Sequence, residues 1–205
     1  MTLPASLRYW LLLSLLPAVL PAWAELSEEL LVRAAQVDHD DSYAYRLPYG
    51  DAVSYAILQS FGSPLSHRGT EYYTVDFGMP EGTLVFSARE GTVVRVEDRF
   101  DLSCWSSECG RFANYVEILH IDGTIGRYFH LQQDSVLVEP GQRIDRGVPI
   151  ARSGDTGYAS VPHLHFGVYR AARDGVEQSI SIRFAVRGGL AVRPRSGARY
   201  TNSSE

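Results

Sequence analysis

Short runs of Val, Ile, Tyr and Phe recur along the chain, and residues that favour turns separate them. Runs of about four to eight such residues between Gly, Pro or Asp are typical of β-strands. They predict strands over residues 83–88, 92–96, 115–120, 125–130, 149–152 and 163–169. Asp122-Gly123 predicts a hairpin turn between two of these strands, because both residues tolerate positive φ. The pattern therefore predicts a mainly β, antiparallel fold.

The N-terminal part of the chain has a different pattern. Residues 1–24 hold no acid and one base, Arg8, before an apolar run over residues 9–20 and the small residues Ala22 and Ala24. This order is typical of a secretory signal peptide that is cleaved after Ala24. The alternative is a membrane anchor, but the run is shorter than the ~20 apolar residues that span a bilayer. We therefore predict export to the periplasm, with release outside the cell as the alternative, and no anchor after cleavage.

The rest of the chain has the organisation of one domain. Its length of 205 residues and 45% hydrophobic share suit a single folded core, and there is no internal repeat or Pro-rich linker. We predict an N-terminal lead over residues 25–45 that begins with a short helix over 25–35. A folded domain over 46–190 and a flexible tail over 191–205 follow.

Charge and cysteine content narrow the class of protein. All 19 basic residues are Arg, and the net charge is -5, whereas nucleic-acid binders are usually basic, so we predict no nucleic-acid partner. Export favours a disulfide between Cys104 and Cys109, the two cysteines of the chain. Free or metal-bound thiols are the alternative, although two thiols alone cannot complete a structural zinc site.

The histidines carry the strongest chemical signal. In the predicted strand that contains His163 and His165, residues two apart share a face, so both imidazoles point one way while Leu164 and Phe166 point into the core. Two imidazoles on one face indicate a metal site, and a solvated strand face is the alternative. By the same alternation, His130 shares a strand face with Tyr128.

Two further histidines carry less weight. His120 lies close to the predicted hairpin turn, and we interpret it as a partly buried structural histidine. His39 lies in an acidic stretch without pattern and is predicted to be solvated.

Imidazoles with one carboxylate and an open coordination position are typical of catalytic zinc sites, which activate water for hydrolysis. The HExxH and GxSxG motifs of other hydrolases are absent from the chain. The sequence therefore favours a zinc hydrolase of a different type.

Several blocks in order resemble the M23 zinc metallopeptidases, the lysostaphin and LytM type of peptidoglycan endopeptidase. These blocks are His67-Arg68-Gly69, Val75-Asp76-Phe77-Gly78-Met79-Pro80, Tyr128-Phe129-His130-Leu131, Gly154-Asp155-Thr156-Gly157 and Pro162-His163-Leu164-His165-Phe166. The resemblance covers about residues 46–186, and the joint match is specific although each block alone is weak. It implies the LytM fold, a barrel-like antiparallel sheet with a duplicated hybrid motif.

The resemblance also implies roles for five residues. His67, Asp76 and His165 would bind one Zn²⁺ per chain, while His130 and His163 would be the catalytic histidines. The implied activity is hydrolysis of peptide cross-links in bacterial peptidoglycan, so the implied partner is its stem peptides. The alternatives are a non-enzymatic regulator of other wall hydrolases and a zinc peptidase that acts on proteins.

The chain departs from the family pattern in two places. The common spacing is HxxxD, whereas here Asp76 lies nine positions after His67 and Glu71 occupies the fourth position. We favour Asp76 over Glu71 as the ligand, because the residues after Asp76 keep the frame of the family and a loop between ligands can lengthen. The second departure is an insertion over residues 98–111, which contains the cysteine pair and is a candidate wall of the substrate groove.

Overall fold

The part of the chain that the computed structural model describes comprises residues 30–31, 40, 42–171 and 177–202. The predicted signal peptide, His39 and, apart from Leu30 and Leu31, the predicted helix over residues 25–35 lie outside it. Within it, no helix has the length and apolar character needed to cross a bilayer.

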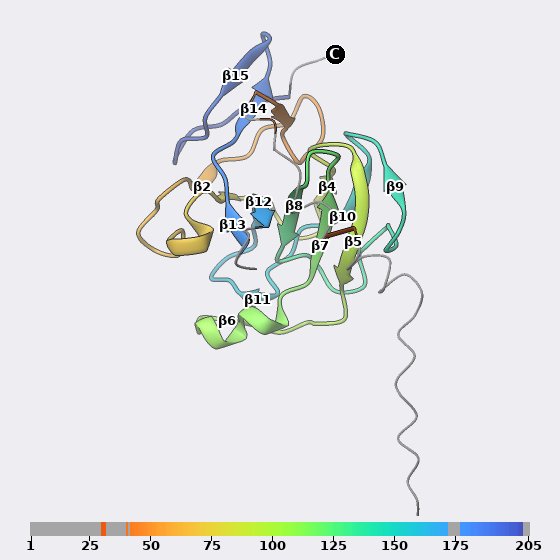
Figure 1. Cartoon of the computed structure of the whole chain (residues 1–205). Coiled ribbons are helices and arrows are strands. Elements are labelled where there is room, and N and C mark those ends of the chain that lie inside the picture. Colours follow the sequence, from red (N-terminus) through yellow and green to blue (C-terminus); the bar gives the residue numbers. More distant parts are fainter. Residues whose placement is uncertain (1–29, 32–39, 41, 172–176, 203–205) are drawn as a thin grey trace, which may run out of the picture.

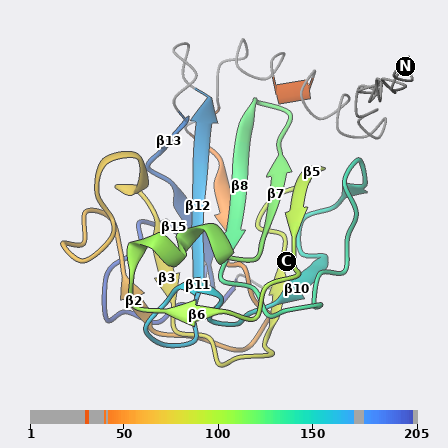
Figure 2. The same ribbon diagram turned by 90° about the horizontal axis from the view of Figure 1, so that it is seen from below.

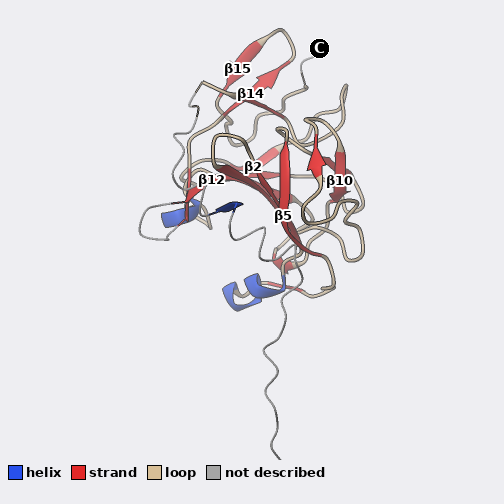
Figure 3. Cartoon of the chain, turned by 45° about the vertical axis from the view of Figure 1, so that its right-hand side comes forward, coloured by secondary structure: helices blue, strands red, loops and turns tan. Residues whose placement is uncertain are grey.

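The described chain is mainly β, as predicted, and its largest element is an eight-stranded antiparallel sheet (Figures 1 and 3). Seven strands run in the order β2-β3-β12-β8-β7-β5-β9, and β13 pairs with β12. Their bounds are β2 Ile57–Gln59, β3 Val75–Phe77, β5 Gly91–Glu97, β7 Tyr115–Leu119, β8 Thr124–Phe129, β9 Arg143–Ile144, β12 Leu164–Ala171 and β13 Glu177–Ser179. Among the described strands, the edges β2 and β9 do not pair with each other, so the sheet is open and the predicted barrel-like closure is absent.

Three smaller sheets complete the fold. Strands β10 and β4 pair antiparallel, β11 and β6 pair parallel, and β14 lies between β1 and β15. The pairing of β1 with β14 is also parallel. The bounds are β1 Ala44–Arg46, β4 Leu84–Phe86, β6 Ser103–Cys104, β10 Pro149–Arg152, β11 Gly157–Tyr158, β14 Arg183–Val186 and β15 Leu190–Val192. Two short 3₁₀ helices are present, η1 over Gly69–Glu71 and η2 over Ser107–Phe112.

The six strands predicted from the sequence correspond to β4, β5, β7, β8, β10 and β12. The hairpin between β7 and β8 is present, with Gly123 at a φ of 76°. Asp122, however, is not among the residues with positive φ. Its carboxylate instead accepts hydrogen bonds from the Thr124 backbone N–H at 3.2 Å and hydroxyl at 2.7 Å. Asp122 therefore stabilises the turn through its side chain rather than through its backbone conformation.

One face of the main sheet forms the core. Phe77 in β3 and Leu164 and Phe166 in β12 are fully buried in one hydrophobic cluster. Burial of an apolar side chain of this size contributes about 1.5–3 kcal/mol. Because side chains alternate along a strand, the intervening Asp76 and His165 point to the opposite face. The sheet thus separates the hydrophobic core from the polar site.

The C-terminal residues pack against the start of the domain rather than forming the predicted flexible tail. Asn202 is 4% exposed, and its side chain accepts a hydrogen bond from Leu47 N at 2.9 Å and donates one to Tyr49 O at 2.7 Å. The Tyr49 hydroxyl donates to the Tyr200 carbonyl at 2.7 Å. These long-range contacts hold the segment to residue 202 in place.

Leu30 and Leu31 of the N-terminal lead lie at the opposite end of β8 from His130. Leu30 and Leu31 pack against Leu119 and Ile125, next to the hairpin turn. His130 follows the other end of β8.

Candidate metal centre

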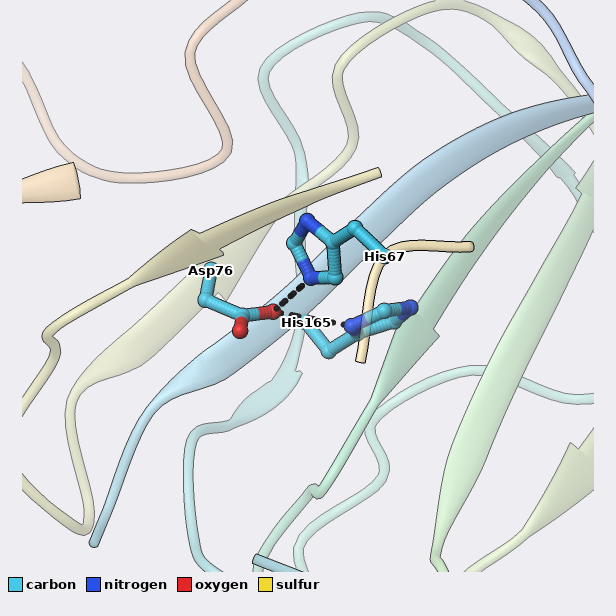
Figure 4. A group of neighbouring side chains, drawn as sticks. All are labelled: His67, Asp76 and His165. Carbon is cyan, nitrogen blue, oxygen red and sulfur yellow. Dashed lines mark hydrogen bonds and ion pairs between the residues drawn. The ribbon is translucent and has the colours of Figure 1, made fainter. Parts of the chain in front are cut away.

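The structure brings together three of the predicted site residues from separate elements. His67 precedes η1, Asp76 is the central residue of β3, and His165 lies directly opposite Asp76 in β12. Asp76 Oδ1 lies 3.1 Å from His67 Nε2 and 2.8 Å from His165 Nδ1. Figure 4 shows both imidazoles directed at this carboxylate. One ligand atom from each of the three residues lies within 4.8 Å of the others. This is a group that can hold a metal ion.

His67 has the orientation that a metal ligand requires. It is fully buried, and its Nδ1 lies 2.9 Å from the Ser60 carbonyl, which can only accept a hydrogen bond. The Nδ1–H therefore donates to Ser60, and Nε2 points at the Asp76 carboxylate without a satisfactory hydrogen bond. His67 Nε2 and the Asp76 carboxylate are then two acceptors that face each other, so a cation between them or a proton on one of them is needed. Separations near 3 Å suit ligand atoms that each lie about 2 Å from zinc, so the residues fit a metal ion.

Glu71 lies on the far side of His165 and is not one of the three converging groups. Its Oε2 is 3.5 Å from His165 Nε2, and the same oxygen accepts a hydrogen bond from the Tyr169 hydroxyl. A carboxylate at Nε2 leaves Nδ1 as the nitrogen that faces Asp76. The preference for Asp76 over Glu71 as the ligand thus agrees with the geometry, and Glu71 orients the ring of His165.

The electrostatics of the group favour a negatively charged Asp76. Burial alone would raise the pKa of Asp76, but the hydrogen bond with His165 and the close contact with His67 outweigh it and hold the pKa well below its usual value. Burial would lower the pKa of His165, yet its contacts with Asp76 and Glu71 raise that pKa to about 9. Asp76 is therefore an anion that attracts positive charge to this point of the sheet.

The two other predicted histidines lie beside this group. The ring centroids of His130 and His163 are 4.6 Å apart, and those of His130 and His165 are 5.8 Å apart. His163 and His165 share one face of the β12 segment while Leu164 is fully buried on the other, which confirms the predicted alternation. All five predicted residues therefore lie together.

The predicted shared face of Tyr128 and His130 is wrong. Tyr128 is fully buried in the core, and its hydroxyl accepts a hydrogen bond from Ala88 N at 2.7 Å. His130 follows the end of β8 and has a φ of 62°, a left-handed conformation that interrupts the alternation of the strand. His130 lines the same groove as His163, and a left-handed conformation is uncommon for a residue other than glycine.

Backbone carbonyls fix both of these rings. His130 Nδ1 lies 2.7 Å from the Thr156 carbonyl, and His163 Nδ1 lies 2.8 Å from the Val161 carbonyl. In each ring the Nδ1–H donates, which leaves the Nε2 lone pair free to accept a proton. Burial and the charges of the neighbouring histidines together lower the pKa of His130 to about 3, and burial lowers the pKa of His163. Both imidazoles are therefore neutral at neutral pH.

The segment that holds His130 depends on a close backbone approach. Gly157 has a φ of 84°, and a Cβ at this position would lie 2.7 Å from the Cβ of Ala113. The Thr156 hydroxyl accepts a hydrogen bond from Asn114 N at 3.0 Å and donates one to Leu131 O at 2.8 Å. The turn at Gly157 thus lets the Thr156 hydroxyl bond to Asn114 and Leu131 while the Thr156 carbonyl faces His130.

Sequence reasoning missed two residues that support the group. Gln59 in β2 donates a hydrogen bond from Nε2 to Asp76 Oδ2 at 2.6 Å, so it fixes the second carboxylate oxygen. Tyr169 in β12 donates to Glu71. Gln59 belongs to no motif. Tyr169, in contrast, is four residues from His165 on the same strand face, and this spacing could have predicted that Tyr169 lies near the group.

The group lies in a groove of about 630 Å³. Its lining includes Gln59, Leu65, Trp105 and Tyr158. The predicted disulfide between Cys104 and Cys109 is present next to Trp105. An open groove with apolar walls and a few converging polar groups is typical of an enzyme site.

His120 lies outside the groove, as predicted for a structural histidine. It is 3% exposed, and its Nδ1 is 2.9 Å from the Thr124 hydroxyl. Burial lowers the pKa of His120 to about 3.

Comparison with known proteins identifies similar sequences. A peptidoglycan DD-endopeptidase of Vibrio cholerae is 35% identical over 103 residues, which are 50% of this chain and 21% of that protein. A glycyl-glycine endopeptidase of Staphylococcus capitis is 34% identical over 137 residues, which are 65% of this chain and 32% of that protein. The chain thus spans about a fifth to a third of the length of these curated relatives.

Solved structures of similar proteins include two peptidases. A zinc-containing peptidase from Vibrio cholerae is 31% identical, with a TM-score of 0.46 over 62% of this chain and 36% of that chain. The catalytic domain of lysostaphin from Staphylococcus simulans is 29% identical, with a TM-score of 0.43 over 64% of this chain and 88% of that chain.

The family comparison covers more than half of the chain. Residues 70–178 match the model of Peptidase family M23, a range that contains Asp76, His130, His163 and His165. His67 lies just before it. The converging side chains and this match agree, and the chain belongs to peptidase family M23.

Proposed function

We propose that the protein is an exported zinc endopeptidase that hydrolyses peptide cross-links of bacterial peptidoglycan. The observation that carries this proposal is the convergence of His67, Asp76 and His165 beside the His130 and His163 pair in one groove. A regulator without catalytic activity would not need all five groups. The complete set therefore favours an enzyme.

His67 Nε2, Asp76 Oδ1 and His165 Nδ1 are the atoms that would hold the ion. Nitrogen and carboxylate ligands of this kind, in a group of three, suit Zn²⁺ in a catalytic site. When bound, zinc supplies Lewis acidity and makes water a better nucleophile near neutral pH. Gln59 and Glu71 keep Asp76 and His165 in the required orientation.

His130 and His163 would move the proton. Each ring has its Nδ1–H bonded to a backbone carbonyl, so Nε2 is the atom that accepts a proton from the attacking water. The same nitrogen then donates that proton to the leaving amine of the peptide bond. Because burial keeps both rings neutral, the base is available without prior deprotonation at neutral pH.

The substrate assignment draws on the relatives. The two sequences described above are named as peptidoglycan DD-endopeptidase and glycyl-glycine endopeptidase. Both names describe cleavage within peptides rather than at their ends. We infer that stem peptides of peptidoglycan are the substrate. The export signal, which is typical of a periplasmic protein, favours a cross-link with meso-diaminopimelate over a polyglycine bridge.

Export is the remaining part of the proposal. Residues 1–24 have the pattern of a signal peptide, and the Cys104–Cys109 disulfide suits an oxidising compartment such as the periplasm. Mass spectrometry of the protein recovered from a periplasmic fraction should find Glu25 as the first residue. Recovery of the uncleaved chain in membranes would contradict this assignment.

Release of fragments from purified peptidoglycan sacculi tests the activity. The zinc-loaded protein should release peptides with new amino termini, and EDTA or His165→Ala should abolish this release. His120→Gln is the matched control, because it alters a buried histidine outside the groove. Release that survives both treatments would refute the proposed chemistry.

A further inference from the structure

The insertion over residues 98–111 forms part of the groove wall. Its strand β6 lies beside β11 (Figure 2) and pairs with it in parallel. In this register Cys104 lies opposite Tyr158. The disulfide between Cys104 and Cys109 joins β6 to η2. This segment, which we call the clamped loop, carries Trp105.

The apolar side chains on the groove walls are unusually accessible to water. Trp105 and Leu65 are each 80% exposed, and Tyr158 is 43% exposed. All three line the same groove as His163 and His165. Large apolar side chains that gather at an exposed site usually mark a binding surface, and Trp and Tyr provide much of the energy at such surfaces.

Packing of the clamped loop does not explain the exposure of Trp105. Helix η2 has no buried residue, so the loop adds little to the hydrophobic core. The disulfide and a few polar contacts hold it, including Gly157 N to Leu102 O at 2.7 Å and Phe100 N to Asn114 Oδ1 at 3.0 Å. The loop is therefore built to present Trp105 rather than to bury it.

The charges of the groove indicate the chemistry of its occupant. Among the described residues that line the groove, Arg127 is the one Arg. Its guanidinium is already paired with Glu117, at 2.9 Å, and with Glu177. The walls therefore offer apolar contact and no uncommitted cation. This favours contact with an uncharged part of a peptide over binding of an anionic group.

We propose that Trp105 is a specificity-determining contact for the peptide next to the scissile bond, and that the disulfide holds it in position. The inference rests on the proposed function, because its occupant is the cross-linked stem peptide. Trp105 shares one groove with the histidines, so it meets the peptide rather than the more distant glycan.

Intrinsic fluorescence provides a direct test. The chain has three Trp residues, Trp10, Trp23 and Trp105, so Trp105 is the single Trp once residues 1–24 are removed. We would titrate the exported His163→Ala protein, which binds without cleavage, with a glycan-free cross-linked stem-peptide dimer. A saturable blue shift of the Trp emission is expected.

Matched variants measure the contribution of Trp105 to binding. In the His163→Ala background, calorimetry with the same dimer should give a Kd at least about 10-fold higher for Trp105→Ala and a smaller change for Trp105→Phe. Ile121→Ala is the control, because Ile121 is 86% exposed at the far end of β8. An unchanged Kd for Trp105→Ala, or a weakening seen only with glycan-bearing fragments, would overturn the proposal.

The clamp is tested in the active protein. The double variant Cys104→Ser, Cys109→Ser should raise KM for the dimer about 3-fold to 10-fold. Its kcat should stay within about 2-fold of the parent and its zinc content should be unchanged, because the loop contributes no metal ligand. An unchanged KM would show that the disulfide does not hold Trp105 in its binding position.

The two hypotheses fail in different ways. If the dimer shifts the Trp105 emission but the zinc-loaded parent protein does not cleave it, the proposed activity fails and the contact stands. If the parent cleaves the dimer and Trp105→Ala binds it equally well, the contact fails and the activity stands.

Discussion

His120 and His130 lie near opposite ends of β8, and both are buried histidines whose pKa burial lowers to about 3. Their surroundings differ. His120 bonds to Thr124 through Nδ1, and its Nε2 has no partner and faces Gly126, where a Cβ would lie 3.2 Å away. His130 instead lies in an open groove, where its ring centroid is 4.6 Å from that of His163.

This comparison shows that burial and a shifted pKa do not by themselves identify a functional histidine. His67 Nε2 and His120 Nε2 both lack a satisfactory hydrogen bond. The first points at a carboxylate that another imidazole also contacts, and the second points at a glycine that offers no side chain. The convergence of several lone pairs on one point is what distinguishes a metal site from a packed ring.

Removal of a converging group should have the largest effect. We expect His67→Ala to purify with little zinc, against about one equivalent per chain for the parent, and to lose hydrolysis, because two ligands remain. Elemental analysis by mass spectrometry checks the metal content. His120→Gln should keep its zinc, and a full equivalent in His67→Ala would break the comparison.

Removal of a proton-transfer group should affect chemistry but not metal content. We expect His163→Ala to lower kcat by about 10²-fold to 10⁴-fold, the range for loss of a general base, while zinc binding is retained. Steady-state kinetics on a defined cross-linked peptide and metal analysis of the same sample check this result. Loss of zinc in His163→Ala would instead assign His163 to the metal ligands.

Loss of the group that orients His165 should have a smaller effect. We expect Glu71→Ala to weaken zinc affinity by about 10-fold to 100-fold, because the His165 ring loses the carboxylate at Nε2. Glu71→Gln should weaken it less, since the amide oxygen can still accept a hydrogen bond. Competition with a chelator measures both affinities, and equal affinities for Glu71→Ala and the parent would exclude an orienting role.

We expect His120 to affect the pH dependence of the free energy of unfolding but not the zinc content. Its folded pKa of about 3 is below the unfolded value of about 6.5, so the unfolded state takes up a proton as pH falls below 6.5. The free energy of unfolding should therefore decrease as the pH decreases below 6.5. His120 contributes at most about 1.4 kcal/mol to this decrease for each pH unit. Asp122, with a pKa of about 2, stays charged in this window.

Urea unfolding at pH 6.5 and pH 5 measures this effect. His120→Gln should lose less stability than the parent between the two pH values, because glutamine does not titrate, and contributions shared by both proteins cancel. The same loss in both proteins would mean that His120 carries no such linkage.

The four longest of the described strands, β5, β7, β8 and β12, were predictable from sequence, whereas among the shorter ones β4 and β10 were predicted and the others were not. Strands such as β8 and β12 carry enough β-branched and aromatic residues for a local signal. Strands β6, β9 and β11 have two residues each, so their pairing depends on contacts with distant segments.

The candidate site divides in the same way. The five histidine and aspartate positions stand in recognisable blocks, and the structure brings them together. The left-handed conformation of His130 has no local signal, so simple alternation placed it on the face of Tyr128. The bond from Gln59 to Asp76 spans separate strands and was equally hidden.

Asn202 illustrates a practical consequence of such distant contacts. Its amide bridges backbone groups of Leu47 and Tyr49 near the other end of the domain. Truncation of the chain before Asn202 would leave those buried groups without partners, even though all the histidines of the groove are retained. An affinity tag is therefore better placed after Asn202 than in exchange for it.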